Sequence, residues 1–146
     1  MTDADRLRLR GRVKVKEAFR ASVYPDSLGF WTIGYGTLVD ARKGGGLTKG
    51  EAEYLLANRL QLAEQACESM EAYRELAPPR QAVLIEMCFN LGAEGLHAFK
   101  RMFSALVRHE YEQAASEMLA SAWSGQVGKR AVELAEQMKT GQWGPS

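Results

Sequence analysis

The sequence predicts an α+β fold that is mainly α, with a small β-rich N-terminal lobe and a helical C-terminal lobe joined by a long helix. Three observations support this prediction: a hairpin pattern between residues 22 and 38, a helix-capping box at residue 48, and helical patterns beyond residue 78. A chain of 146 residues has the size of one domain. We place the lobes at about residues 1–48 and 73–146, with the connecting helix at about 49–72.

The first segment permits two interpretations. Residues 6–16, RLRLRGRVKVK, alternate between basic and apolar side chains, which is typical of a strand with one solvated face. The alternative is a helix in which Leu9 and Val13 share a face and Gly11 is an unfavourable residue. The pattern by itself leaves both open.

The following segment has the signals of a β-hairpin. Residues 25–29, PDSLG, are rich in turn formers, and they separate Val23-Tyr24 from the aromatic and β-branched residues 30–33. Gly34 and Gly36 bracket Tyr35, which permits tight backbone bending or close approach of a ligand to the main chain. A third short strand through residues 38–39 would complete a small sheet.

The rest of the chain is predicted to be helical. Thr48 and Glu51 have the spacing of a capping box, and an apolar stripe then runs for about five turns to Cys67. Pro78-Pro79 begins a strongly apolar helix over residues 81–91. Further helical patterns cover about residues 97–107, 110–123 and 129–139, the last stopped by Gly141.

The composition excludes several classes of protein. Hydrophobic and charged fractions of 46% and 25% are typical of a globular protein, and a net charge of +1 gives no support for nucleic-acid binding. No stretch approaches the ~20 apolar residues of a membrane helix, and the N-terminus is charged, so we expect a cytosolic protein without stable membrane association. We interpret Cys67 and Cys88 as ordinary small residues, with one disulfide as the alternative.

The remaining candidates for chemistry are carboxylates, because no nucleophile elbow, HExxH motif or phosphate-binding loop occurs in the sequence. Glycoside hydrolysis uses two of them, one as a proton donor and one to activate water or attack carbon. Asp26 lies in the predicted turn and Glu17 in a basic run. Taken singly, Asp26 is more typical of a residue that caps its own turn than of a catalytic one. Glu17 taken singly is likewise more typical of a surface ion-pair partner than of an acid.

The spacing of these residues carries more information. In EAFRASVYPDSLGFWTIGYG, eight residues separate Glu17 from Asp26 and five separate Asp26 from Thr32. This segment closely resembles the active-site segment of phage-type lysozymes, glycoside hydrolase family 24. The resemblance covers nearly the whole chain: residues 47–53 resemble the family's interlobe helix, residues 82–92 its central buried helix and residues 123–143 its C-terminal region.

The resemblance implies a lysozyme-like fold with the active site in the cleft between the two lobes. By it, Glu17 is the general acid, Arg130 pairs with Glu17 and fixes its orientation, and Asp26 and Thr32 flank the attacking water. Such a geometry belongs to an inverting enzyme, in which the carboxyl groups stand roughly 6.5–9.5 Å apart. The resemblance leaves open whether Asp26 acts as a base or as an electrostatic stabiliser. The resemblance implies no metal and no cofactor.

The resemblance also implies that Leu38 and Phe89 contact the substrate. For Phe89, a plain packing role in the core is an equally supported alternative. Other positions depart from the family pattern. The family usually has an acidic residue, a glycine and a histidine where this chain has Lys16, Ala18 and Thr37, and polar uncharged residues where it has Met102 and Glu117.

The expected function is that of a muramidase that cleaves the β-1,4 bond between N-acetylmuramic acid and N-acetylglucosamine in peptidoglycan. We expect a monomer that stays in the host bacterial cytoplasm until a separate holin-like membrane permeabiliser lets it reach the wall, for host lysis by a phage or prophage. Two alternatives are a peptidoglycan-binding module that has lost catalysis and a lytic transglycosylase that forms an anhydro product. A purely helical interaction protein would not explain the hairpin.

Overall fold

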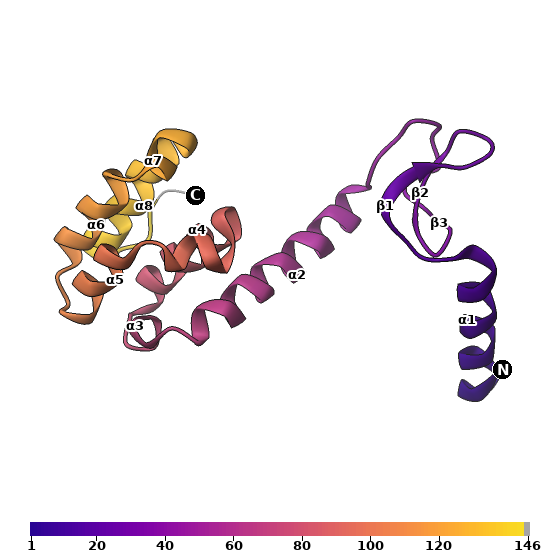
Figure 1. The fold of residues 1–146 in the computed structure, drawn as a ribbon, viewed down its shortest axis with the longest axis horizontal. Helices are drawn as coiled ribbons and strands as arrows, with labels where there is room; N and C mark the ends of the chain where they lie inside the picture. The colour runs from indigo at the N-terminus through magenta and orange to yellow at the C-terminus, as the bar shows by residue number, and fades with distance from the viewer. Residues whose placement is uncertain (145–146) are drawn as a thin grey trace. The chain divides into compact units, whose positions relative to one another are not determined.

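The computed structural model describes residues 1–144 and confirms the α+β class, with several helices and one small antiparallel sheet (Figure 1). The chain forms two compact units, one of residues 1–55 and one from Leu56 onward. The first unit contains α1 (Asp3–Glu17), β1 (Arg20–Pro25), β2 (Trp31–Gly34), β3 (Thr37–Leu38) and the start of α2 (Lys49–Glu68).

Helix α1 settles the alternative that the alternating pattern left open. The Thr2 hydroxyl accepts a hydrogen bond from the Asp5 backbone N–H at 3.1 Å, and the Asp5 carboxylate accepts one from the Thr2 backbone N–H at 2.8 Å. Acidic residues thus stand at the positive end of the helix dipole, and Lys14 and Lys16 stand in its last turn. The alternating side chains consequently spread around the helix, and none of its residues is buried.

The sheet has the strand order β1-β2-β3, and both pairs are antiparallel. Arg20 pairs with Gly34 and Tyr24 with Thr32, so β1 contains a bulge between these two pairs. On the other side of β2, Thr32 pairs with Leu38. The predicted hairpin and third strand are therefore present, and Thr32 is the central residue of a row across all three strands.

The loop between β3 and α2 is held by a buried carboxylate. Asp40 accepts hydrogen bonds from the Arg42 guanidinium at 2.6 Å and from the Gly46 backbone N–H at 3.1 Å. The hydrogen bonds from Arg42 hold the pKa of Asp40 well below its usual range. The predicted capping box then opens α2: the Thr48 backbone N–H and hydroxyl both donate to the Glu51 carboxylate, at 2.9 and 2.8 Å.

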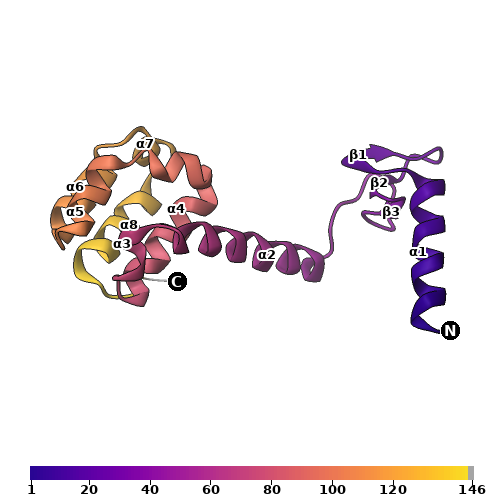
Figure 2. The same ribbon diagram turned by 60° about the horizontal axis from the view of Figure 1, so that its bottom comes forward.

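The second unit is built from helices that gather around one core (Figure 2). The helical patterns of the sequence correspond to real helices, but Gly92, at φ +74° and ψ 167°, interrupts the long apolar one. Gly141 adopts a left-handed conformation and ends the last helix as predicted. The elements are α3 (Glu71–Arg74), α4 (Pro78–His97), α5 (Lys100–Val107), α6 (Tyr111–Leu119), α7 (Ala122–Val127) and α8 (Lys129–Thr140).

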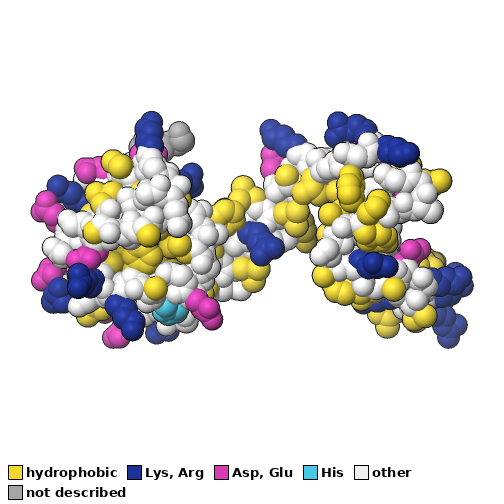
Figure 3. All heavy atoms as spheres, turned by 45° about the horizontal axis from the view of Figure 1, so that its top comes forward, with side chains coloured by type: hydrophobic (Ala, Val, Ile, Leu, Met, Phe, Trp, Pro, Cys, Tyr) yellow, Lys and Arg dark blue, Asp and Glu magenta, His cyan; other side chains and the backbone are white. Residues whose placement is uncertain are grey.

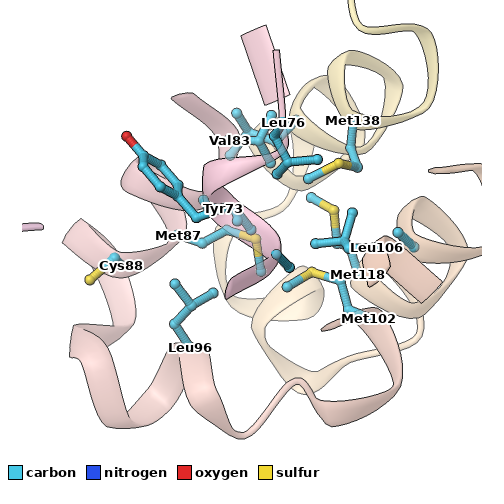
Figure 4. Packing of buried hydrophobic residues seen from close by; sticks show 14 of the residues in the cluster. Tyr73, Leu76, Val83, Met87, Cys88, Leu96, Met102, Leu106, Met118 and Met138 are labelled. Atoms are coloured by element: carbon cyan, nitrogen blue, oxygen red, sulfur yellow. The ribbon is translucent and has the colours of Figure 1, made fainter. Parts of the chain in front are cut away.

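Methionine dominates the centre of this core. Five of the six methionines are buried, and four of them point toward one another between α4, α5, α6 and α8 (Figure 4). Their flexible thioether chains fill irregular space between short helices. Leu84 is fully buried in the same cluster, where burial of such a side chain is worth about 1.5–3 kcal/mol.

The two cysteines and the apolar stripe of α2 were also predicted from the sequence. Cys67 and Cys88 are free thiols buried in the core, in agreement with their interpretation as ordinary small residues rather than a disulfide. Helix α2 forms as predicted, but its apolar stripe is buried only in part: Leu55 and Leu56 are 46% and 47% exposed. Within residues 1–144, every helix is too short or too polar to cross a membrane.

Candidate active site

Glu17 is the last residue of α1, and its exposed side chain lies against the turn between β2 and β3. A Cβ atom placed on Gly36 would stand 2.5 Å from Oε2 of Glu17 and 2.7 Å from Cδ, so a side chain there would displace the Glu17 carboxyl group. Gly36 also has φ +72°, a conformation that favours glycine. The Gly-Tyr-Gly pattern permitted tight backbone bending or close approach of a ligand, and in the structure the group next to Gly36 is the Glu17 side chain.

Ala18 follows Glu17 in an unusual backbone conformation. Its φ and ψ are 54° and 152°, close to a region that is essentially restricted to glycine. Its N–H nevertheless donates to the Lys14 carbonyl at 3.1 Å and completes the last turn of α1. Glycine adopts such a conformation without crowding of a Cβ atom.

Asp26 occupies the turn between β1 and β2 and is half-buried. Its Oδ1 atom accepts hydrogen bonds from the backbone N–H groups of Leu28 at 2.9 Å and Phe30 at 2.8 Å. This is the turn-capping role expected of an aspartate taken singly. Within residues 1–144, Oδ2 makes no such hydrogen bond, so one carboxylate oxygen remains available to a water molecule.

Thr32 is buried, with 5% of its surface exposed, and its hydroxyl donates to the Phe30 carbonyl at 3.2 Å. Leu38 lies directly opposite Thr32 in the register of β2 and β3, and its side chain is exposed. Because directly paired residues of antiparallel strands point to the same face, Leu38 lies beside Thr32 on that face.

Glu17 and Asp26 lie toward opposite ends of β2. Glu17 contacts the turn that follows Gly34, whereas Pro25, the neighbour of Asp26, pairs with Trp31. Gly34 is three residues after Trp31 on the strand, which corresponds to about 10 Å between their Cα atoms at roughly 3.3 Å per residue. The first unit thus contains all three residues predicted to be catalytic, with the two carboxylates attached to well-separated points of the backbone.

The opposite face of the sheet is apolar. Trp31 and Ile33 alternate with Thr32, so they point away from it. Together with Leu47 and Tyr54 they line a groove of about 720 Å³ within the first unit. Exposed hydrophobic side chains of this unit are visible in yellow in Figure 3.

Arg130 and Phe89 both belong to the second unit. Arg130, in the first turn of α8, donates to the Glu86 carboxylate of α4. Glu86 and Phe89 are three residues apart, so they share a face of α4. Phe89 is 44% exposed and lines a cavity of about 420 Å³ between α2 and α4, which excludes its interpretation as a plain core residue.

Sequence reasoning did not identify Glu86 as the partner of Arg130. A signal was available, because Glu86 is the one charged residue of the apolar run 81–91. Neither Met102 nor Glu117 was assigned a role, yet both border a cavity of about 430 Å³ that Lys100 and Arg101 also line. Among residues 1–144, no cluster of side chains has the composition of a metal site.

Comparisons with known proteins cover most of the chain. The family model described as "Phage lysozyme" matches residues 14–139, a range that includes Glu17, Asp26, Thr32 and Arg130. Two relatives come from Dictyostelium discoideum. "Probable T4-type lysozyme 1" is 24% identical and "Probable T4-type lysozyme 2" is 23% identical, each over 91% of this chain and 94% of the relative.

Proposed function

Because the chain belongs to the phage lysozyme family and is a lysozyme-type peptidoglycan hydrolase, we propose that it cleaves the β-1,4 bond between N-acetylmuramic acid and N-acetylglucosamine with inversion. The observation that carries the proposal is the occurrence in one unit of Glu17 at a helix end, Asp26 in a hairpin turn and Thr32 on the next strand. Two carboxyl groups on opposite sides of a sugar are what such a reaction requires.

Glu17 is the proposed general acid. Within residues 1–144, no residue forms a hydrogen bond or an ion pair with its carboxyl group, so the group is free to approach a glycosidic oxygen. The contact with Gly36 restricts where the side chain can lie. In the reaction the proton of Glu17 passes to the leaving oxygen as the bond from that oxygen to the anomeric carbon breaks.

Asp26 and Thr32 are proposed to hold the attacking water. The Oδ2 atom of Asp26 is available to accept a proton from this water, while the hydrogen bonds at Oδ1 fix the carboxylate. The oxygen of the water bonds to the anomeric carbon, and its proton passes to Asp26. Inversion requires room for a water between acid and base, so Glu17 and Asp26 are proposed to stand on opposite sides of the sugar.

Arg130, Leu38 and Phe89 complete the proposed site. Leu38 and Phe89 are proposed to contact the sugar, and their exposure is compatible with this role. Arg130 is proposed to orient Glu17. Since its guanidinium is paired with Glu86, this role requires Arg130 either to bind both carboxylates or to leave Glu86 for Glu17.

The biological part of the proposal is lysis of a host bacterium by a phage or prophage. In this proposal the enzyme is a monomer in the host cytoplasm, and a separate holin-like protein opens the membrane so that the enzyme reaches the peptidoglycan. The description of the family supports this role, whereas the two relatives from Dictyostelium discoideum do not bear on it.

Product analysis tests the proposed chemistry. Purified peptidoglycan is digested with the protein and with Glu17→Gln, and the products are identified by mass spectrometry and by NMR at early times. We expect reducing-end N-acetylmuramic acid that appears first as the α-anomer, and none with Glu17→Gln. Anhydro-muramic ends would instead indicate a lytic transglycosylase, the β-anomer would indicate retention, and binding without products would indicate a binding module.

A further inference from the structure

We propose that Tyr35 is a positioning residue for Glu17, which it holds in place through the turn of residues 34–36. The inference rests on the proposed role of Glu17 as the acid. Tyr35 itself is not proposed to touch the substrate. Its contribution is to fix how closely the backbone of Gly36 approaches the Glu17 carboxyl group.

The ring of Tyr35 contacts the chain on both sides of Glu17. The Lys14 ammonium lies 5.3 Å from the ring centroid, and Lys14 is one helical turn before Glu17. The ring of Phe19, two residues after Glu17, lies 5.5 Å from the Tyr35 ring at an interplanar angle of 50°. Both geometries are within the range of favourable cation–π and aromatic contacts. One side chain of the turn therefore docks it onto the end of α1.

The Glu17 side chain depends on this docking because nothing else fixes it. It has no hydrogen-bond or ion-pair partner within residues 1–144, and its position is limited by its contact with Gly36. If the turn moves away, the carboxyl group gains rotamers that point elsewhere. A general acid must stand within hydrogen-bonding reach of the leaving oxygen, so a wider range of rotamers lowers the rate of the chemical step.

The contacts of Tyr35 come from its ring. In residues 1–144, its hydroxyl group forms no hydrogen bond with another side chain or with the backbone. Tyr35→Phe should therefore retain activity, whereas Tyr35→Ala should lose it. Tyr54→Ala is the matched control, because Tyr54 is also an exposed tyrosine of the first unit and lies in the apolar groove.

The first experiment measures kcat and KM of these variants on soluble peptidoglycan fragments, with folding checked by circular dichroism. We expect Tyr35→Ala to lower kcat by about 10- to 100-fold with little change in KM. Tyr35→Phe and Tyr54→Ala should stay within about twofold of the original protein. Equal kcat for Tyr35→Ala and Tyr54→Ala would overturn the proposal, as would loss of activity in Tyr35→Phe.

Two glycines of the turn provide a second, independent comparison. Gly34 and Gly36 have φ values of +68° and +72°, so alanine strains the backbone similarly at both. Only at Gly36 would the new Cβ collide with Glu17, since the space around Gly34 is open. We expect Gly36→Ala to lose far more activity than Gly34→Ala at equal stability. Similar losses in the two variants would contradict the role of this contact.

A spectroscopic measurement separates this proposal from the proposed function. NMR scalar couplings of Glu17 report its side-chain rotamers whether or not the residue is the acid. We expect one dominant rotamer in the original protein and in Tyr35→Phe, and averaged couplings in Tyr35→Ala. Full activity of Glu17→Gln would refute the assignment of the acid while leaving these couplings interpretable. Unchanged couplings in Tyr35→Ala would refute the positioning role alone.

Discussion

Replacing Ala18 with glycine should stabilise the first unit. Ala18 has φ 54° and ψ 152°, where the Cβ atom of a non-glycine residue is crowded by the backbone. Glycine removes this crowding and keeps the hydrogen bond from the residue 18 N–H to the Lys14 carbonyl. The rest of the α1 terminus need not move.

The size of the effect follows from two opposing contributions. A residue held in such a conformation costs about 1–3 kcal/mol. Glycine has more freedom than alanine in the unfolded chain, which removes about 0.4–1 kcal/mol of stability. We therefore expect a net gain of about 1 kcal/mol. For a chain of this length, that corresponds to a rise of roughly 2–4 °C in Tm if unfolding is cooperative.

The assay is denaturant unfolding of the full chain, with amide hydrogen exchange of β1 and β2 as the reporter of the first unit. Ala41→Gly is the control, because Ala41 is exposed, lies outside helices and strands, and has an ordinary negative φ. It should lose about 0.4–1 kcal/mol. A loss of similar size in Ala18→Gly would show that residue 18 does not hold the strained conformation.

Three further predictions concern the core, the loop that contains Asp40, and a buried thiol. Leu84 is fully buried, so Leu84→Ala should lower the free energy of unfolding by about 2–5 kcal/mol. Val132 is exposed, so Val132→Ala should lower it by less than about 0.5 kcal/mol. Equal losses in the two variants would contradict the burial of Leu84. The lowered pKa of Asp40 means that its stabilising effect is present above the unfolded value and is lost as pH falls through the lower folded one. The NMR shift of the Gly46 amide should therefore stay constant as pH falls past 3.8, whereas a titration centred there would count against the Asp40 network. Burial raises the pKa of Cys67 and keeps the thiol from solvent, so at pH 8 this thiol should react with an alkylating reagent much more slowly in native than in unfolded protein; equal rates would show that it is accessible.

Local signals in the sequence were sufficient for much of the fold. The Thr48–Glu51 capping box, the hairpin around Asp26 and the helix stop at Gly141 all depend on residues close together in the chain, and all are present in the structure. The alternation in residues 6–16 was ambiguous because side-chain period alone does not distinguish a strand from a charged helix. A capping interaction outside that pattern, between Thr2 and Asp5, favours the helix.

Long-range partners could not be predicted in the same way. Arg130 pairs with Glu86, 44 residues earlier, and that contact depends on how α4 and α8 pack. The docking of Tyr35 between Lys14 and Phe19 likewise requires the hairpin to return to the end of α1. The glycines around Tyr35 permitted tight backbone bending or close approach of a ligand, and the position of Glu17 beside Gly36 could not be predicted from them.

Peptidoglycan hydrolysis through Glu17 is tested most directly by the loss of turbidity of outer-membrane-permeabilised Gram-negative cells, with the original protein and Glu17→Gln compared at equal folding by circular dichroism. We expect the original protein to clear the suspension and Glu17→Gln to leave it turbid, because the substituted amide cannot give up a proton to the leaving oxygen. Equal clearing by both would show that Glu17 is not the acid, and no clearing by either would contradict the assignment as a peptidoglycan hydrolase.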